Sequence, residues 1–241
     1  MTKLRTAALS DIGHLRTHNE DRFIQNDALG VYGVADGVGG LPGGEAAAQL
    51  AVDEITSAVG AMTALTDPAL TTAVHRTNES VANLGHRLSP GMGIGTTLTF
   101  GVIRDGSIHL AHIGDSRCYV CHKGHIEMLT RDHSVESDAR VRRAQGEVVY
   151  YHQSNRNALT RCIGQPTPPE VDLLTRPLKA GERYLFCSDG VTRLIRESEL
   201  AEYLSLDAEP AEILRQIVEL ANRRGGPDNS TGILIFVDEV S

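Results

Sequence analysis

Short apolar runs that end in an acidic residue recur along this chain of 241 residues. Two are closely alike, Val34-Ala35-Asp36-Gly37 and Phe186-Cys187-Ser188-Asp189-Gly190, and variations occur at Asn19-Glu20-Asp21, Ile113-Gly114-Asp115 and Asp228-Asn229. Such runs are typical of buried strands, so we expect the carboxylates at strand ends, gathered at one rim of the fold. Several negative charges in one cleft are unfavourable unless cations neutralise them. Oxygen ligands without an organised set of His or Cys favour Mg²⁺ or Mn²⁺, so the pattern predicts a multi-metal hydrolytic site.

Composition and charge narrow the class of protein. The formal net charge of −8 argues against a general nucleic-acid-binding protein, which would need a basic face. No apolar run reaches the length of a membrane span, and the N-terminus lacks the apolar core of a secretory signal. The four cysteines suit reduced thiols, and the spacing of Cys118 and Cys121 in a predicted strand points them to opposite faces. We therefore expect a cytoplasmic protein that binds neither membrane nor nucleic acid.

Nine segments have the character of β-strands between turn signals. Tight turns at Asp105-Gly106 and Lys123-Gly124 favour antiparallel hairpins. The segment Thr231–Val237 is apolar on both faces, which suits a central strand covered on each side. The predicted strands are Leu4–Ser10, Arg22–Gln25, Val31–Ala35, Gly95–Ile103, Ser107–Ile113, Arg117–Cys121, Glu170–Thr175, Arg183–Cys187 and Thr231–Val237.

Three further segments repeat apolar residues with the period of an amphipathic helix. Helix pairs between blocks of hairpins predict an α+β fold, in which two packed antiparallel sheets carry helices on the outside. Because no repeat or linker interrupts the chain, we expect residues 1–241 to form a single domain. The predicted helices run from Glu45 to Ala58, from Asp67 as cap with Pro68 at the first helical position to Leu84, and from near Asp207 with Pro210 in the first turn to Ala221.

Residues 133–155 are rich in Arg, Glu, Gln and Ser, with only a weak helical period around Val135–Val141. We expect a surface excursion beside the site. Long irregular insertions are often functional, but a plain solvated loop is an equal interpretation here. His133 and His152 could assist proton transfer, although a structural or surface role is favoured for each.

The glycine-rich segment Gly37–Glu45 is similar to a nucleotide-binding loop only in composition. It lacks the Lys-Ser/Thr of a P-loop, and Pro42 occupies the third glycine position of G-x-G-x-x-G. We favour a compact turn into the following helix, with the Gly37 carbonyl as a suitable hard metal ligand. Arg16, five residues before Asp21, offers a planar fork of donors that suits a phosphate dianion, while a solvated surface charge is the alternative.

The segment Cys187–Arg193 matches C-x-x-G-x-x-R, the cradle of cysteine-dependent tyrosine phosphatases. Two details oppose that interpretation. Phe186 stands where such enzymes typically place His, and Asp189 would put a carboxylate inside a loop that must hold a dianion. We therefore favour Cys187 as a small buried apolar residue. Activity that survives EDTA would indicate the thiolate mechanism instead.

Taken in order, these motifs resemble the metal-dependent protein phosphatases of type 2C, and the form without appended domains resembles their compact bacterial branch. The resemblance covers nearly the whole chain. The matching segments are Asp11–Asp21, Val34–Gly40, Gly95–Thr97, Ile113–Arg117, Asp132–Ser134, Arg156–Arg161, Cys187–Gly190 and Gly226–Thr231.

The resemblance implies a four-layer αββα sandwich with a binuclear Mg²⁺ or Mn²⁺ centre between the sheets. It implies that Asp36 bridges both tightly bound ions. Asp189 and Asp228 would lie on one ion, and the Gly37 carbonyl on the other.

Other positions follow from the same resemblance. Asp21 would hold metal-bound water, with Glu20 as a second, water-mediated contact. Asp115, together with Asp189, would form a weaker third metal site. Arg16 matches the phosphate-binding arginine.

The implied activity is hydrolysis of phosphoserine and phosphothreonine by direct attack of a metal-bridging hydroxide. Substrates would be phosphorylated proteins made by a bacterial Ser/Thr kinase in signalling, and the enzyme would be a monomer. Residues 133–155 match the mobile flap. Val38 replaces the His that many eukaryotic members carry after the bridging Asp-Gly, so the general acid is unassigned. The alternative is a catalytically silent phosphatase-like module that binds phosphoproteins. Such modules usually lose metal-site carboxylates, which this chain retains.

Overall fold

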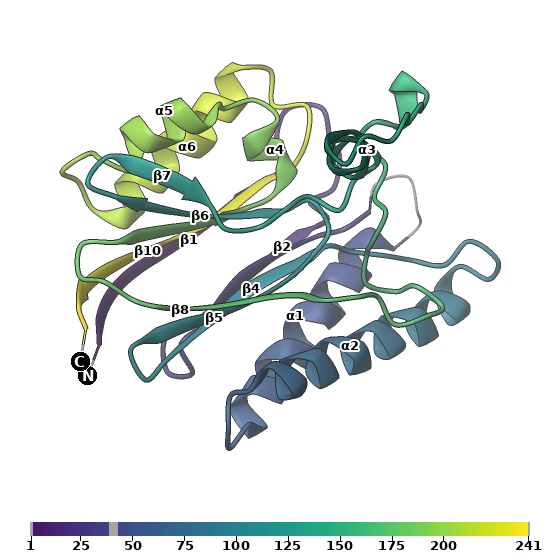
Figure 1. Cartoon of the computed structure of the whole chain (residues 1–241), viewed down its shortest axis with the longest axis horizontal. Helices are drawn as coiled ribbons and strands as arrows, with labels where there is room; N and C mark the ends of the chain where they lie inside the picture. The colour runs from purple at the N-terminus through teal and green to yellow at the C-terminus, as the bar shows by residue number, and fades with distance from the viewer. Residues whose placement is uncertain (1, 39–42, 241) are drawn as a thin grey trace.

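The computed structural model describes residues 2–38 and 43–240, so residues 39–42 of the glycine-rich segment lie outside the described residues. Two five-stranded antiparallel sheets pack face to face, and helices lie on the outer side of each (Figure 1). One sheet has the strand order β1-β10-β9-β6-β7, and the other has the order β2-β3-β4-β5-β8. The predicted α+β sandwich of two antiparallel sheets is confirmed.

All nine predicted strands form, with ends shifted by up to three residues. The strands are β1 Lys3–Asp11, β2 Asp21–Asn26, β3 Val31–Asp36, β4 Leu98–Arg104, β5 Ser107–Ile113, β6 Arg117–His122, β7 His125–Met128, β8 Asp172–Pro177, β9 Arg183–Cys187 and β10 Ser230–Glu239. The helices are α1 Gly44–Ala61, α2 Asp67–Leu88, α3 Val135–Ala144, α4 Asp189–Thr192, α5 Glu197–Tyr203 and α6 Pro210–Arg223, with a short 3₁₀ turn at Gln153–Asn155.

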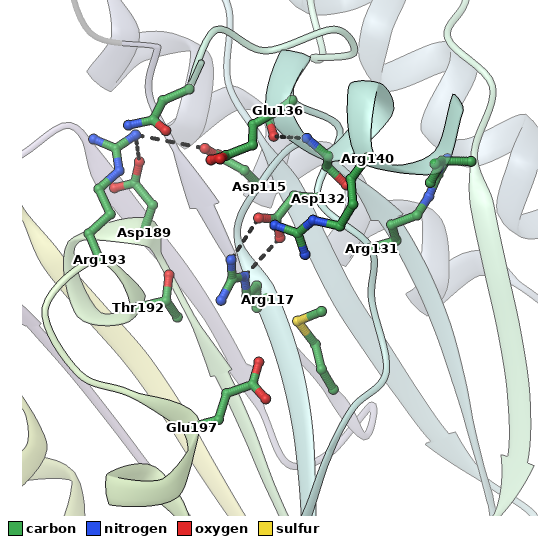
Figure 2. A pocket seen from close by; sticks show the side chains of 15 residues that line it. Asp115, Arg117, Arg131, Asp132, Glu136, Arg140, Asp189, Thr192, Arg193 and Glu197 are labelled. Atoms are coloured by element: carbon green, nitrogen blue, oxygen red, sulfur yellow. Dashed lines mark hydrogen bonds and ion pairs between the residues drawn. The ribbon is translucent and has the colours of Figure 1, made fainter. Parts of the chain in front are cut away.

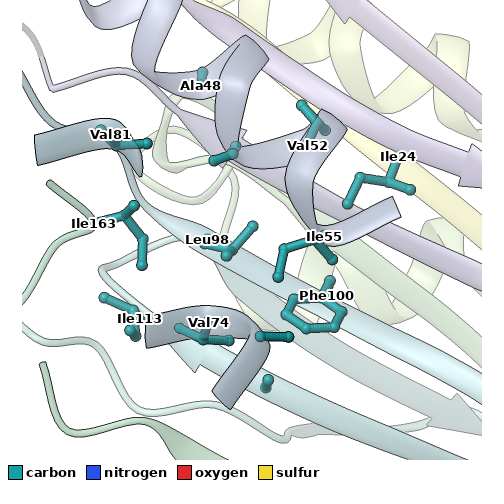
Figure 3. Close-up of a cluster of buried hydrophobic side chains, with 14 of the residues drawn as sticks. Ile24, Ala48, Val52, Ile55, Val74, Val81, Leu98, Phe100, Ile113 and Ile163 are labelled. Atoms are coloured by element: carbon teal, nitrogen blue, oxygen red, sulfur yellow. The ribbon is translucent and has the colours of Figure 1, made fainter. Parts of the chain in front are cut away.

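Three apolar clusters hold the layers together. The first lies between α1, α2 and the second sheet, where Ile55 and Val74 pack towards Phe100 (Figure 3). The second lies between the first sheet and α5 and α6, and the third fills the space between the two sheets. Along β10, Ile233 faces the third cluster and its neighbour Leu234 faces the second. This strand is covered on both faces, as its apolar pattern predicts.

The two cysteines of the C-x-x-C pair divide in the same way, with Cys118 in the cluster between the sheets and Cys121 in the cluster under α5 and α6. Opposite faces are what an odd spacing in a strand predicts.

Several local features differ from the sequence-based expectation. The cap of α2 is Thr66, whose side chain accepts a hydrogen bond from the Ala69 N–H, and Asp67 is already helical. The weak period near Val135–Val141 is a real helix, α3, capped by Ser134. His133, expected on a surface excursion, is fully buried, because it anchors the start of this segment in the domain.

Strands β1 and β10 pair along their whole length, from Lys3 opposite Glu239 to Asp11 opposite Ser230. The first end of this ribbon brings the two chain termini together (Figure 1). At the other end, β1 leads into the loop that carries Arg16, and β10 begins two residues after Asp228. The residues of interest therefore lie at the end of the sandwich opposite the termini.

No described helix is long and apolar enough to cross a bilayer.

Candidate active site

Two of the predicted carboxylates face one another across a strand pair. Asp21 is the first residue of β2 and Asp36 the last residue of β3, and they are directly paired in the antiparallel register. Side chains of directly paired residues lie on the same face of a sheet. The acidic ends of two apolar runs are thus brought together by pairing alone.

The other sheet contributes two more carboxylates. Asp189 begins α4 immediately after β9, and Asp228 precedes β10. The hydroxyl of Ser188 ties the sheets together, because it donates to Asp21 Oδ2 at 2.7 Å and accepts from the Thr231 N–H at 3.0 Å. Sequence reasoning assigned no role to Ser188, although its place inside the Ser-Asp-Gly motif is a usable signal.

Asn229 holds the loop that carries Arg16. Its side-chain oxygen accepts from the Glu20 N–H at 2.8 Å, and its side-chain nitrogen donates to the carbonyls of Ile12 and His18 at 2.9 and 3.1 Å. The Asp-Asn motif therefore joins a candidate ligand to a residue that shapes the loop carrying Arg16. From the sequence, Asp228 is predicted as a ligand, but no role is predicted for Asn229.

Asp115 is placed by the turn between β5 and β6. Thr97 accepts a hydrogen bond from the Asp36 N–H at 2.9 Å, and its hydroxyl lies 2.8 Å from that of Ser116. Gly114 has φ of +112°, and a Cβ there would lie 2.6 Å from the Thr97 side chain. This close approach brings the turn, and Asp115 with it, next to Asp36.

These side chains surround one cavity of about 530 Å³. Asp21 lies behind the lining, only 2% exposed. Gly37 is in the lining, and its N–H donates to the Glu20 carbonyl at 3.2 Å. The apolar side chain of Val38 also stands in the lining. The remaining predicted residues in the lining are Arg16, Glu20, Asp36, Asp115, Asp189 and Asp228.

Burial and mutual repulsion raise the pKa of these carboxyls. Burial is the first cause for Asp36, whose pKa lies well above its ordinary value, and the charges of Asp21 and Asp189 add to it. The pKa values of Asp21 and Asp115 are raised in the same way, by burial first and then by neighbouring carboxylates. Asp21 Oδ1 is buried with no hydrogen-bond partner among the described residues. Unpaired, mutually repelling oxygens of this kind fit divalent cations.

Arginines contact the same carboxylates. Arg16 Nη2 donates to Asp228 Oδ2 at 2.9 Å, and Arg193 forms an ion pair with Asp189. Within residues 2–38 and 43–240, no three His, Cys, Asp or Glu side chains converge as a ready-made metal-binding group. The predicted ligands are therefore neighbours around one cavity, with guanidinium groups supplying positive charge between them.

Cys187 faces away from this cavity. Its side chain packs in the apolar cluster under α5 and α6, and burial raises the pKa of its thiol to about 12. A buried thiol of this kind is an inert apolar residue. The match to C-x-x-G-x-x-R is thus a coincidence of spacing.

A second cavity of about 420 Å³ lies between α3 and the start of α4 and α5 (Figure 2). Asp115, Asp189 and Arg193 belong to the walls of both cavities. The segment with α3 is anchored by His133, which exchanges hydrogen bonds with Gly114, the residue before Asp115. Residues 133–155 therefore do flank the candidate site.

The chain is similar to named serine/threonine phosphatases. A sequence model of the family Protein phosphatase 2C matches residues 4–230. The serine/threonine phosphatase stp of Listeria monocytogenes is 30% identical over 238 residues, which cover 95% of this chain and 94% of that protein. The serine/threonine protein phosphatase PstP of Mycobacterium tuberculosis is 32% identical over 241 residues, which cover 97% of this chain and 45% of PstP.

A solved structure of the PstP catalytic domain in complex with two manganese ions superposes with a TM-score of 0.85 at 31% identity, covering 98% of this chain and 99% of that one. Fold and sequence agree along nearly the whole chain. This chain belongs to the protein phosphatase 2C family.

Proposed function

We infer that this chain is a protein phosphatase that hydrolyses phosphoserine and phosphothreonine with Mg²⁺ or Mn²⁺. The observation that carries the inference is the meeting of carboxylates from both sheets around one cavity, with Arg16 in its wall. Membership of the protein phosphatase 2C family gives the reaction class. The relative PstP has been solved with two manganese ions, which supports the same cations here.

We propose that Asp36, Asp189 and Asp228 hold the two tightly bound cations, together with the Gly37 carbonyl. The raised pKa of Asp36 supports this assignment, because the carboxylate gains most from a cation where burial and neighbours disfavour its charge. When bound, the cations would supply an acidified water and positive charge beside the phosphoryl group.

Asp21 and Glu20 are proposed to orient water at this centre. The buried Asp21 Oδ1 without a partner among the described residues is an acceptor aimed at no protein donor. Asp115 is proposed to hold a weaker third cation with Asp189, since both carboxylates lie near the same guanidinium.

Arg16 is proposed to grip the phosphate. Its guanidinium is partly exposed and has one carboxylate partner, Asp228, so that it can turn towards a dianion in the cavity. Val38 cannot donate a proton, so water is the simplest donor to the leaving group. Cys162 also lines the cavity, but burial raises the pKa of its thiol, which disfavours a thiolate nucleophile.

We propose the physiological setting from the family membership and the single core. We propose that the substrates of the enzyme are proteins phosphorylated by a bacterial Ser/Thr kinase and that it acts in cytoplasmic signalling; the family membership supports phosphorylated proteins as the substrate class. A single catalytic domain over residues 1–241, acting as a monomer, agrees with one continuous core between the two sheets.

A silent module that only binds phosphoproteins is the second candidate. Loss of metal-site carboxylates would favour it, but Asp36, Asp189 and Asp228 are all present at the cavity. Catalysis is therefore the better-supported function.

Substitution of Asp36 tests the assignment. Asp36→Ala should reduce Mn²⁺-dependent hydrolysis of p-nitrophenyl phosphate by roughly a hundredfold or more, because metal-ion catalysis supplies several kcal/mol. EDTA should abolish the wild-type activity. The matched control is Cys187→Ser, in the same β9–α4 region but facing away from the cavity, and it should retain most activity.

If Asp36→Ala keeps activity within about threefold of wild type, the loss is far smaller than a metal ligand should cause. That result would rule out this metal centre. Complete inactivation of a folded Cys187→Ser variant, with wild-type activity resistant to EDTA, would revive the thiolate mechanism.

A further inference from the structure

Arg193 lies where three of the candidate ligands meet. It follows α4, one helical turn after Asp189, and its backbone N–H donates to the Asp189 carbonyl at 2.8 Å. Its guanidinium pairs with the Asp189 carboxylate, and Nη2 lies 3.8 Å from Asp115 Oδ2 (Figure 2). Nη1 lies 3.9 Å from Asp228 Oδ2. No other arginine in the described part of the chain has three carboxylate partners within ion-pair distance.

These partners come from separate segments and are largely buried. The side chains of Asp115 and Asp189 are each 12% exposed, and that of Asp228 is 21% exposed. A guanidinium keeps its charge at any physiological pH and is weakly hydrated, which suits it to such a position. Burial is the largest influence on the pKa of Asp189 and raises it. The neighbouring charge of Arg193 comes next and lowers it.

A guanidinium and a divalent cation compete for the same oxygens. The atoms near Arg193 are Oδ2 of each of the three aspartates, which are also the groups proposed to hold metal. A cation that took Asp115 and Asp189 as ligands would have to displace the guanidinium from both, or share them with a like charge at short distance.

We propose that Arg193 is the internal counter-ion of the acidic cluster and competes with the most weakly held divalent cation. It stabilises the metal-free protein, because it neutralises carboxylates that would otherwise repel one another. For the same reason it weakens the binding of the cation assigned to Asp115 and Asp189. The inference rests on the proposed metal-dependent function. It adds that Arg193 sets the cation concentration at which the most weakly held ion binds.

The test measures metal binding and stability, with no need for substrate. Arg193→Gln removes the charge and keeps much of the side-chain bulk. The matched control is Arg223→Gln, which removes the same charge from an exposed side chain at the end of α6 that pairs only with Glu219, at 3.8 Å. Each protein is titrated with Mn²⁺ by calorimetry, and its thermal midpoint is measured in EDTA and in saturating Mn²⁺.

Two effects of opposite sign are expected for Arg193→Gln. Its weakest Mn²⁺ site should bind roughly three- to tenfold more tightly than in wild type, the size expected from losing partly exposed ion pairs. In EDTA its thermal midpoint should fall below that of Arg223→Gln, and saturating Mn²⁺ should close the gap. Arg193→Lys should lie between wild type and Arg193→Gln, because lysine keeps the charge but lacks the planar fork whose separate nitrogens approach Asp115 and Asp228.

Other outcomes would overturn the proposal. Unchanged Mn²⁺ affinity would show that Arg193 does not compete with the cation. Loss of both affinity and stability, even in saturating Mn²⁺, would make it a structural residue only. If wild type binds no Mn²⁺, the proposed function fails and this inference fails with it, whereas the first two outcomes leave the proposed function standing.

Discussion

At the scale of single residues, the two arginines at the cavity have different freedom. Arg16 lies in a loop, 37% exposed at its side chain, and has one ion-pair partner, Asp228. Arg193 is fixed by a helical turn and has three partners. A partly exposed ion pair is worth about 1 kcal/mol or less, so Arg16 can leave Asp228 for phosphate at small cost.

Arg16→Ala should therefore raise KM for phosphorylated peptides more than it lowers kcat. Charge-assisted hydrogen bonds are worth roughly 1.5–3 kcal/mol, which corresponds to a ten- to hundredfold rise in KM. Arg16→Lys should recover only part of the loss, because it lacks the planar fork. Steady-state kinetics with one phosphopeptide give both constants. Unchanged values for Arg16→Ala would make Arg16 a surface charge and leave phosphate recognition to the metals.

The sequence predicts the acidic residues of the site well and their partners poorly. Asp36 and Asp189 are marked by apolar runs that end at them, a local signal that survives without the fold. The ion pairs of Arg193 with Asp115 and Asp228, and the hydrogen bond from Ser188 to Asp21, join residues far apart in sequence. No local sequence pattern encodes such contacts, because they depend on how the two sheets pack. They therefore could not be predicted from the sequence.

At the scale of elements, the β9–α4 turn is the tightest junction near the site. Gly190 packs against the backbone of Asn229, and a Cβ at this position would lie 1.9 Å from the Asn229 carbonyl oxygen. The turn and the start of β10 therefore fit only if residue 190 has no side chain. The Asp-Gly pair, read from sequence as a strand end, is also a packing requirement.

Gly190→Ala should lower the free energy of unfolding by about 3 kcal/mol or more, since backbone has to move to relieve the overlap. Weaker Mn²⁺ binding should accompany this loss, because Asn229 neighbours Asp228. Gly60→Ala is the control: its Cβ would meet only Leu29 at 3.4 Å, and alanine is favoured over glycine in a helix by about 0.5–1 kcal/mol. Urea denaturation measures both variants, and equal stabilities would contradict the packing argument.

Short elements were the ones that the sequence did not reveal. Strand β7 has no fully buried residue, and α5 has one, Leu200. Such segments lack enough apolar residues to show a period. Longer elements such as α6 and β10 bury a whole face or both faces, and these the sequence predicts to within a few residues.

At the scale of the whole molecule, the site exists only when the two sheets are packed, because each sheet supplies part of the carboxylates. Two buried histidines join β5 to the segment 133–155 beside this site. His112 and His133 lie with ring centroids 4.6 Å apart. The His112 Nε2–H donates to the Arg131 carbonyl at 2.9 Å, and Nδ1 lies 2.8 Å from the Thr99 hydroxyl. A neutral ring satisfies both contacts.

The contribution of His112 to the stability of the protein should therefore fall in acid. Burial first, and then the neighbouring His133, lower the pKa of His112 from 6.5 to about 4. Between these values the unfolded chain binds a proton that the folded chain refuses, so stability is lost as pH falls from 6.5 towards 4. The loss from this group is up to about 3 kcal/mol.

Urea denaturation in EDTA at pH 4 to 7 isolates the effect by comparing variants. His112→Gln should show a smaller acid-induced loss than wild type, whatever its stability at pH 7. The exposed His86 on α2 supplies the control, and His86→Gln should keep the wild-type pH dependence. The carboxyls with raised pKa act in the opposite direction, but they are common to all three proteins. Equal slopes for wild type and His112→Gln would show that His112 does not contribute.

The ends of the chain meet on neighbouring strands, so the polypeptide is close to a closed ring. Lys3 pairs with Glu239 in the β1–β10 ribbon, and their charged groups lie 3.9 Å apart. The acidic cavity lies beyond the far end of the same ribbon, roughly 25 Å away along β1. If the domain were inserted into a loop of a host protein, both connections would leave from the same end of the β1–β10 pair. The acidic cavity would then face away from the host. The architecture is thus suited to insertion into a loop of another protein.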